Sequence, residues 1–417
     1  MTRSPFTVGT CGAAIGAMVC ACSAIAGIPD RELASPHDGG APLDGSAPLD
    51  AARGDDLGDA TPDSPADAAL DLATGVPTNL AAIETAPGDA AIVLVTSDGT
   101  WTVASENADG PWSGQSKISA SGFAPPGAPV AVAWQTSTQL DAFVVGNDGT
   151  IFLSSLALGF TWGAARAITA SGIAPAGAHL AAVQQGSSVD LFFVDSKGVV
   201  EELSLTGTTW AGPIALSDAG FAPAGAPIAH GAYSATQLDI AVVDTGGAVQ
   251  AIHFGGALPG WSAPKALTSA AWTSPGASLE MQMQGTSQLD LFAVDAQGRV
   301  AVFLSDGDAG WANPSLITPS AGFAPPGASL AASPQGSQLD LFVVDAKGTL
   351  DVTFVIGNGG WSQPAALTAA SFLQPGAPVA VAAQNASTLD AFFASNGAAW
   401  ITWEANDGAW TAPATVL

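Results

Sequence analysis

The residues best suited to metal binding and nucleophilic catalysis are scarce in most of this chain. All cysteines lie at the start, at Cys11, Cys20 and Cys22. The rest of the chain therefore has no thiol for a disulfide, a thiolate metal site or a nucleophile. Histidine is almost as rare, with one residue in the polar N-terminal stretch and three later ones, His179, His230 and His253. We therefore expect no metal centre and no cofactor.

Paired carboxylates are the remaining route to catalysis, because glycoside hydrolysis needs two Asp or Glu side chains facing one bond. The candidates that look exposed are Glu201 with Glu202, and Asp306 with Asp308. Charges of this kind are common in hairpin loops, and that interpretation is preferred for both pairs. The carboxylates do not indicate an active site.

A short turn sequence, Ser-Asp-Gly-Thr-Trp at 97–101, resembles the Asp-box turn of sialidase propellers. Those enzymes hold the substrate carboxylate with several arginines. From residue 79 onward this chain has only Arg166 and Arg299, and its one tyrosine is Tyr233. The sequence therefore predicts a protein that is not an enzyme.

The elements that carry these residues follow from an internal repeat. Seven tryptophans recur at spacings of 50, 48, 51, 50, 50 and 49 residues: Trp112, Trp162, Trp210, Trp261, Trp311, Trp361 and Trp410. We call them the Trp ladder. An apolar-Asp-apolar motif recurs at the same period, at Asp141, Asp190, Asp239, Asp290, Asp340 and Asp390. We call these the ladder aspartates. A fixed period near 50 residues indicates a repeat architecture.

One copy, residues 327–377, shows the structure expected of each repeat. The apolar run 339–344 predicts a strand covered on both faces, and the turn 345–348 ends in Gly348, which favours a hairpin. Residues 349–355 are expected to pair with the strand 339–344, and Trp361 to open a fourth short strand. Four strands per 50 residues match a propeller blade. We therefore predict an all-β, seven-bladed β-propeller over residues 79–417.

A residue present in every blade is either part of the scaffold or one copy of a multivalent site. We expect the Trp ladder to pack blade against blade, because a buried tryptophan covers a large area. We expect the ladder aspartates to accept backbone N–H bonds from the preceding loop. A ring of metal-binding carboxylates is disfavoured, because no second oxygen ligand follows at useful spacing.

The repeat, Leu-Asp-x-Phe followed by Trp-Ser-x-Pro or Trp-x-x-Pro, resembles that of the PLL-type bacterial seven-bladed propeller lectins. Fungal fucose-specific lectins are six-bladed relatives in style. In the PLL-type family, a Leu-Trp-His-x-Trp-Trp segment follows, and fucose or galactose derivatives sit between blades against aromatic rings. The resemblance covers residues 79–417. Five blades of this chain lack the aromatic pair, for example at 348–351.

The resemblance implies that a sugar site lies where aromatics remain. Blade one has Trp101 near Trp112, and blade seven has Trp400 and Trp403 followed by Trp410. These two blades become neighbours when the ring closes, so the five tryptophans are the predicted carbohydrate contacts. A packed closure patch is the favoured alternative for the same aromatics, because large apolar residues are more often packed than exposed. Trp134 and Trp272 are interpreted as packing or loop residues.

The N-terminal segment predicts export. Residues 6–19 form a short charge-free apolar run, too short to span a bilayer. Two cleavage sites compete: Ala24-Ile25-Ala26 fits ordinary signal peptidase, and 19–23 resembles a lipoprotein box with Cys22 as the lipidated residue. We predict a signal at 1–26, a disordered Pro/Gly/Asp-rich linker at 27–78 and the propeller at 79–417. The protein is expected outside the cytoplasm, secreted or as a bacterial outer-membrane lipoprotein.

The composition restricts the partners. Nine Lys and Arg against 36 Asp and Glu give a net charge of -27, which disfavours nucleic acid. We expect a membrane contact only through a lipid anchor at Cys22. The leading hypothesis is a non-enzymatic, lectin-like propeller that binds fucose- or galactose-type glycans. The alternatives are a protein-interaction or surface-display scaffold without sugar sites and, less favoured, a glycoside-acting enzyme.

Overall fold

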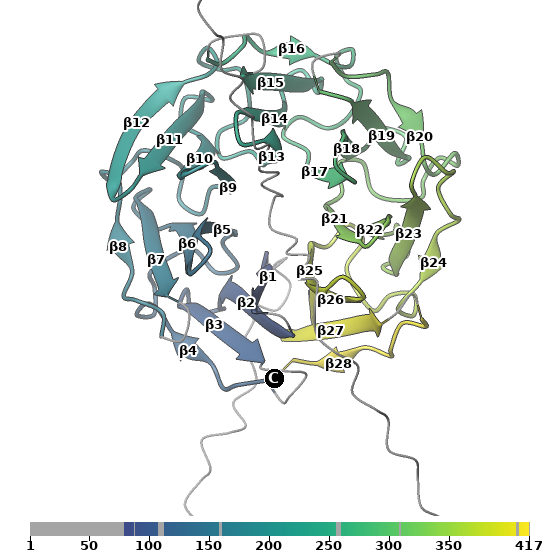
Figure 1. Cartoon of the computed structure of the whole chain (residues 1–417), viewed down its shortest axis with the longest axis horizontal. Helices are drawn as coiled ribbons and strands as arrows, with labels where there is room; N and C mark the ends of the chain where they lie inside the picture. Colours follow the sequence, from purple (N-terminus) through teal and green to yellow (C-terminus); the bar gives the residue numbers. More distant parts are fainter. Residues whose placement is uncertain are drawn as a thin grey trace, which may run out of the picture.

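The computed structural model describes residues 79–86, 88–106, 112–157, 161–255, 260–307, 310–405 and 408–416. Within these ranges every regular element is a β-strand, and the strands form seven four-stranded antiparallel sheets arranged in a ring (Figure 1). Each sheet uses four strands that are consecutive in sequence. The predicted seven-bladed β-propeller is confirmed.

The first four blades contain strands β1 to β16. Blade 1 comprises β1 (Ala81–Ala86), β2 (Asp89–Val95), β3 (Trp101–Glu106) and β4 (Ser116–Lys117). Blade 2 comprises β5 (Val130–Thr136), β6 (Gln139–Val145), β7 (Ile151–Ala157) and β8 (Arg166–Ala167). Blade 3 comprises β9 (Leu180–Gln185), β10 (Ser188–Val194), β11 (Val200–Thr206) and β12 (Thr209–Ala215). Blade 4 comprises β13 (Ile228–Ser234), β14 (Gln237–Val243), β15 (Val249–Gly255) and β16 (Lys265–Ala266).

The last three blades contain strands β17 to β28. Blade 5 comprises β17 (Leu279–Gln284), β18 (Gln288–Val294), β19 (Val300–Ser305) and β20 (Ser315–Leu316). Blade 6 comprises β21 (Leu330–Gln335), β22 (Gln338–Val344), β23 (Leu350–Ile356) and β24 (Ala365–Ala366). Blade 7 comprises β25 (Val379–Asn385), β26 (Thr388–Ser395), β27 (Ala398–Ala405) and β28 (Ala414–Thr415).

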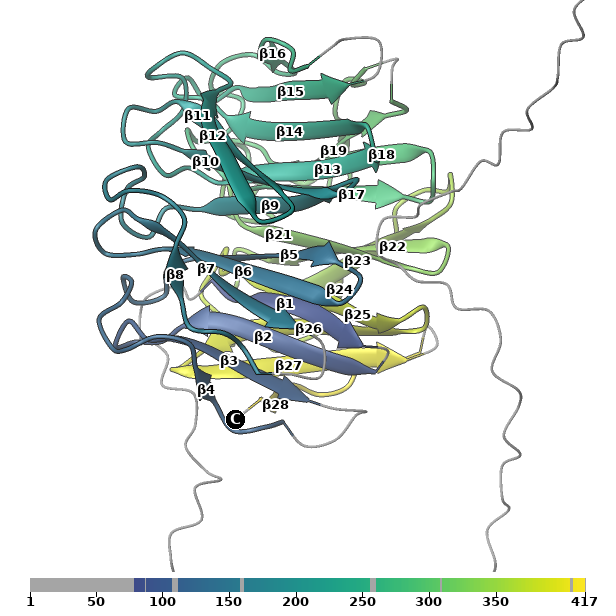
Figure 2. The ribbon, with the colours of Figure 1, turned by 60° about the vertical axis from the view of Figure 1, so that its left-hand side comes forward.

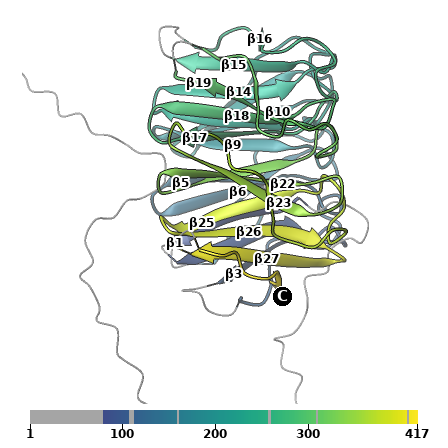
Figure 3. The same cartoon turned by 90° about the vertical axis from the view of Figure 1, so that its right-hand side faces the viewer.

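The second strand of each blade forms the most buried layer. In β22 every residue after Gln338 is buried, including Leu339 and Phe342. The run is apolar on both faces because each blade is covered by a neighbour on either side. Figure 3 shows the ring edge-on, with the strands crossing its thickness. Figure 2 shows the sheets of neighbouring blades stacked face to face.

The hairpin between the second and third strands depends on a glycine. Gly348 has a φ of 74°, and a Cβ there would lie 2.2 Å from the carbonyl oxygen of Leu373. Asp345 closes the turn, since its Oδ1 accepts the backbone N–H groups of Lys347 and Thr349, each at 2.8 Å. The predicted hairpin is confirmed, and both backbone conformation and close packing explain its glycine.

The fourth strand differs from the expectation that Trp361 would open it. In blade 6 the fourth strand is the two-residue β24, which begins four residues after Trp361. Ser362 N already donates to the Phe354 carbonyl at 2.8 Å, but Pro364, directly before β24, lacks the N–H that continuous pairing needs. The outer strand is short in six of the blades, including blades 1 and 2, which have no proline directly before it, and the longer β12 contains Pro213.

The core of the protein is divided among the seven seams between neighbouring blades. Each of seven buried apolar clusters combines side chains from two adjacent blades. The Trp ladder contributes to these seams: Trp361 of blade 6 lies edge-on to Phe292 of blade 5, with ring centroids 5.5 Å apart. Trp272 lies edge-on to Phe303 at 5.5 Å and is a packing residue as predicted. The ladder therefore holds blade to blade.

The ring closes between blades 7 and 1 without exchanging strands. Strand β1 packs against β25, and Figure 1 places the blue blade 1 beside the yellow blade 7. Ile92 and Leu94 of blade 1 share a buried cluster with Phe392 and Ile401 of blade 7. The closure seam is therefore an apolar interface like the others.

The ladder aspartates are buried, but their donors differ from those expected. Asp290 accepts a bond from Gln288 Nε2 at 2.7 Å, and Gln338 Nε2 donates to both carboxylate oxygens of Asp340 at 2.9 and 3.1 Å. These are side-chain donors rather than backbone N–H groups of the preceding loop. The correction follows from position, because each aspartate lies inside its strand, where backbone N–H groups pair within the sheet.

Several predictions concern residues outside the described ranges. The signal segment 1–26, its Cys22 and the linker 27–78 all lie there. Within the described residues, no helix is long and apolar enough to cross a bilayer.

Candidate functional site

Trp400 and Trp403, predicted to act together, face opposite sides of β27. They lie three residues apart on one strand, and successive strand side chains alternate between faces. Trp400 pairs across the sheet with Phe393, and Trp403 pairs with Asp390. The Trp-x-x-Trp spacing therefore divides the two rings between two seams.

Trp400 belongs to the seam between blades 6 and 7. Its ring lies edge-on to Phe372 with centroids 5.0 Å apart, and its Nε1 donates to the carbonyl of Ser395 at 3.1 Å. Trp410 packs into the same cluster, edge-on to Phe342 at 5.4 Å. Both side chains are half-buried, and both contribute to blade packing.

Trp112 lies in the seam between blades 7 and 1. It is a member of the Trp ladder and lies edge-on to Phe392 of blade 7 at 5.6 Å. Ile401 joins the same cluster, and by strand alternation Trp403 shares the face of Ile401. The structure thus brings Trp112 and Trp403 to one seam and places Trp400 and Trp410 in the next.

Trp101 does not fit the predicted role of a sugar contact. Its side chain is 0% exposed and stacks against Phe123 at 6.2 Å in the seam between blades 1 and 2. Trp101 opens β3 in a part of the blade where apolar residues face the neighbouring blade, so its size contributes to the core. No ring face remains for a ligand.

Trp403 is the predicted contact whose ring is open to solvent, with 38% of the residue exposed. The main chain around it is held in place, because Trp403 N donates to Thr411 Oγ1 at 3.1 Å and Thr411 N donates back to the Trp403 carbonyl at 2.9 Å. The ring therefore stands on a fixed strand beside the closure seam. A fixed, exposed aromatic face is suited to stacking against an apolar ligand surface.

Two further exposed residues occupy the same register, and the sequence analysis did not identify them. Phe354 of blade 6 pairs with Asp340, and Leu304 of blade 5 pairs with Asp290, as Trp403 pairs with Asp390. They are 37% and 36% exposed. The sequence contains the signal, since each follows its ladder aspartate by 14 residues, and Trp403 follows by 13. Three successive blades thus present an apolar side chain at one register.

A comparison with known structures identifies proteins that share this architecture. The crystal structure of the BP39L lectin from Burkholderia pseudomallei matches with a TM-score of 0.78 and 32% sequence identity, covering 82% of this chain and 99% of that one. The chain belongs to the family of bacterial seven-bladed β-propeller lectins. No family model and no curated protein matches it. The resemblance of the repeat to that of seven-bladed propeller lectins is thereby confirmed.

A more distant match supports the fold of this lectin-family propeller. AofleA from Arthrobotrys oligospora matches with a TM-score of 0.51 and 13% identity, covering 84% of this chain and 88% of that one. At this identity the likeness concerns architecture alone.

The carboxylate pair Glu201 and Glu202 is not arranged for glycoside hydrolysis in this propeller. As neighbours on β11 they point to opposite faces. Glu202 is buried rather than exposed, and its Oε2 accepts Trp261 Nε1 at 2.7 Å. Burial raises the pKa of Glu202 to about 7, and nearby Asp190 adds to the shift. Asp306 is exposed, whereas Asp308 lies outside the described residues.

In the turn at 97–101, the carboxylate of Asp98 holds the turn together through hydrogen bonds. Asp98 Oδ1 accepts Thr96 Oγ1 at 2.6 Å and Thr100 N at 3.0 Å, and these bonds lower the pKa of Asp98. Across the described ranges no three His, Cys, Asp or Glu side chains come together in a way that would hold a metal ion.

Proposed function

We propose that this propeller binds carbohydrate without catalysing a reaction, and that Trp403 provides the principal contact. The observation that carries the proposal is the exposed indole of Trp403, whose main chain is held in place beside a blade seam in a member of a lectin family. A sugar presents an apolar C–H face that stacks on an aromatic ring, while polar groups read its hydroxyls. Trp112, half-buried in the same seam against Phe392, is the proposed second aromatic contact.

The ligand class that this site favours is a fucose- or galactose-type glycan. Such sugars present a compact apolar face, which one indole can cover, and the family resemblance supports the same class. Trp400, Trp410 and Trp101 support the blades in this account and do not contact the glycan.

A glycan array tests the proposal directly. The full-length protein is compared with Trp403→Ala and with the matched control Leu304→Ala, which removes an equally exposed side chain at the same register. We expect a fucose- or galactose-type signal that Trp403→Ala weakens by roughly tenfold and Leu304→Ala retains. A folded wild type that binds no glycan would overturn the proposal.

One observation favours a second candidate function, a protein-interaction scaffold. Leu304, Phe354 and Trp403 expose apolar surface at one register on three successive blades. Contiguous exposed apolar patches mark protein-binding surfaces, and a repeated apolar position gives a partner several matched contacts. Partner capture that Leu304→Ala and Trp403→Ala weaken equally, and that free sugar does not compete, would favour this function.

We also propose that the protein acts outside the cytoplasm, either secreted or held by a lipid on Cys22. The apolar run 6–19 and the small residues around Cys22 support export. Labelling of growing cells with a radioactive fatty acid distinguishes the two routes. Label that Cys22→Ser removes and Cys20→Ser retains would establish the anchor.

A further inference from the structure

The last part of the chain presents a surface without exposed charge. Between residues 352 and 416 the described residues include only two charged ones, Asp390 and Glu404, and both are buried. Asp407 lies outside the described residues. This stretch contains most of β23, all of β24 and the four strands of blade 7. We call it the neutral sector.

The outer strands show the same contrast around the ring. Strands β4, β8 and β16 each expose one basic residue: Lys117, Arg166 and Lys265. The outer strands of the neutral sector instead expose small neutral residues, Ala365-Ala366 in β24 and Ala414-Thr415 in β28. These strands lie on the outside of the ring (Figure 1). The neutral sector therefore reaches the rim, where another molecule can approach it.

Apolar side chains project from this sector. Phe354 and Ile356 lie on one face of β23, since they are two residues apart, and they are 37% and 56% exposed. Among the large apolar side chains that the structure describes, that of Ile356 is the most exposed. Large apolar side chains exposed next to each other mark a surface for interaction.

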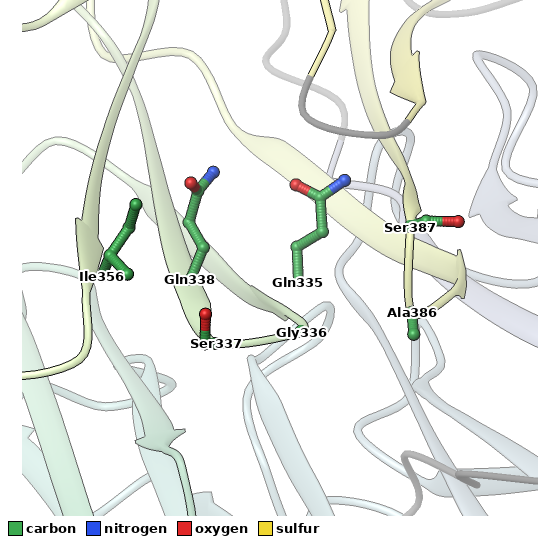
Figure 4. A pocket seen from close by; sticks show the side chains of 7 residues that line it. All are labelled: Gln335, Gly336, Ser337, Gln338, Ile356, Ala386 and Ser387. Atoms are coloured by element: carbon green, nitrogen blue, oxygen red, sulfur yellow. The ribbon is translucent and has the colours of Figure 1, made fainter. Parts of the chain in front are cut away.

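A hollow opens beside Ile356. Its volume is about 380 Å³, and it lies between the first hairpins of blades 6 and 7 (Figure 4). Residues 335–338 line one side, Ala386 and Ser387 line the other, and none of the lining residues is charged. The surface thus carries a projecting ring, Phe354, next to a neutral recess. A surface with both features suits a two-fold contact between identical chains, which must be self-complementary.

Electrostatics favour a second copy of this chain as the partner. Two copies that each carry a net charge of -27 repel each other wherever exposed carboxylates meet. Contact through the neutral sectors brings together surfaces without exposed charge and keeps the charged blades apart. A basic partner would instead be drawn to carboxylates outside the sector. The sector is also large enough for one side of a standard interface, which uses roughly 20–30 residues.

We propose that two copies of this chain associate through their neutral sectors in a two-fold contact. Phe354 of each copy packs against Ile356 of the other at the mouth of the hollow. Both side chains lose their exposed apolar area, and this burial drives the association. The proposal goes beyond carbohydrate binding and does not depend on it, because the contact uses neither Trp403 nor Trp112.

Sedimentation velocity of the full-length protein without sugar tests this contact. The test variant is Ile356→Lys, and the matched control is Ile214→Lys, which changes a 49% exposed isoleucine on blade 3. Both variants have the same net charge, so a difference between them reports the position of the change. We expect the wild type and Ile214→Lys to form dimers and Ile356→Lys to dimerise about tenfold more weakly, because the two-fold contact would receive two unpaired charges. Circular dichroism checks that all three proteins are folded.

The salt dependence of the dimer gives a second readout. Raising the salt concentration from about 0.05 M to about 0.5 M screens the repulsion between acidic copies, so we expect the dimer to tighten. A dimer that weakens with salt would indicate ion pairs and overturn the neutral contact. A wild type that stays monomeric at both salt concentrations would also overturn it. Two lysine variants that dimerise equally would place the contact elsewhere, for example at the apolar run 6–19, and overturn the proposal as well.

Discussion

Gln384 of blade 7 donates its Nε2 to the carboxylate of Glu106 in blade 1 at 2.8 Å, although the two residues are 278 positions apart. The same nitrogen bonds to Asp390 Oδ2 at 2.7 Å, so one amide joins two carboxyl groups across the closure seam. All three side chains are buried. The ring is thus closed by a polar bridge in addition to apolar packing.

Replacing Gln384 should weaken ring closure. Gln384→Met keeps the side-chain length and leaves two buried carboxyl groups without their shared donor. We expect it to lower the free energy of unfolding by roughly 1–3 kcal/mol. Chemical denaturation measures the loss, and Gln363→Met, at an exposed glutamine, should change it little. Equal stability of the two variants would contradict the bridge.

A second polar contact crosses the seam between blades 3 and 4, where Trp261 Nε1 donates to Glu202. Trp261→Phe keeps an aromatic ring against Phe192 and removes the donor. The control is Trp361→Phe, which removes an indole that packs in the same way on Phe292. We expect Trp261→Phe to lower the free energy of unfolding by about 1–3 kcal/mol more than this control does. Equal losses in calorimetry would show that the bond contributes nothing.

The sequence predicts the architecture well because the scaffold repeats. Trp361 recurs in every blade and Phe342 in most of them, so the period alone is enough to locate the seams between blades. The alternation of side chains along a strand also places Trp400 and Trp403 on opposite faces, although the spacing alone suggests a pair.

The site is less predictable because it depends on contacts between blades. The burial of Trp101 follows from Phe123 and the neighbouring blade, which the local sequence does not show. The amide of Gln335 is buried without a hydrogen-bond partner, while Gln338, its partner across the hairpin, bonds to Asp340. Such features need the three-dimensional arrangement of at least two blades.

Gly348 should be intolerant of a side chain. Gly348→Ala places a Cβ against the Leu373 carbonyl at a φ of 74°. The backbone conformation alone costs about 1–2 kcal/mol for an L-residue, and the close contact adds to it. Gly360→Ala, where a Cβ meets nothing within 4 Å, is the control for thermal unfolding. A Gly348→Ala protein as stable as this control would contradict the close approach.

Stability should fall as the pH rises from mildly acidic to mildly basic. Burial raises the pKa of Glu280 from 4.5 to about 8, against the opposing effect of its bond with the Ala332 backbone. The folded state then holds a proton that the unfolded state has released, so stability is lost between those two pH values. Asp290, with its pKa raised by burial to about 6, acts in the same direction.

Thermal melts of Glu280→Gln across the same window test this dependence. We expect the variant to lose less stability than the wild type between pH 4.5 and about pH 8, because its side chain does not ionise. His230 has the opposite effect on the pH dependence of stability. Burial lowers its pKa to about 4, so its contribution to stability is lost as the pH falls below 6.5. An unchanged pH profile in Glu280→Gln would contradict the assignment.

Titration of methyl α-fucoside and methyl β-galactoside into the wild type, Trp403→Phe and Trp403→Ala by isothermal calorimetry tests the central claim most directly. Loss of an aromatic stacking contact worth up to about 1.5 kcal/mol corresponds to roughly a tenfold weaker Kd. We predict that Trp403→Phe retains most of the affinity for the bound glycoside and that Trp403→Ala loses about tenfold. The same Kd in all three folded proteins would contradict carbohydrate binding at Trp403.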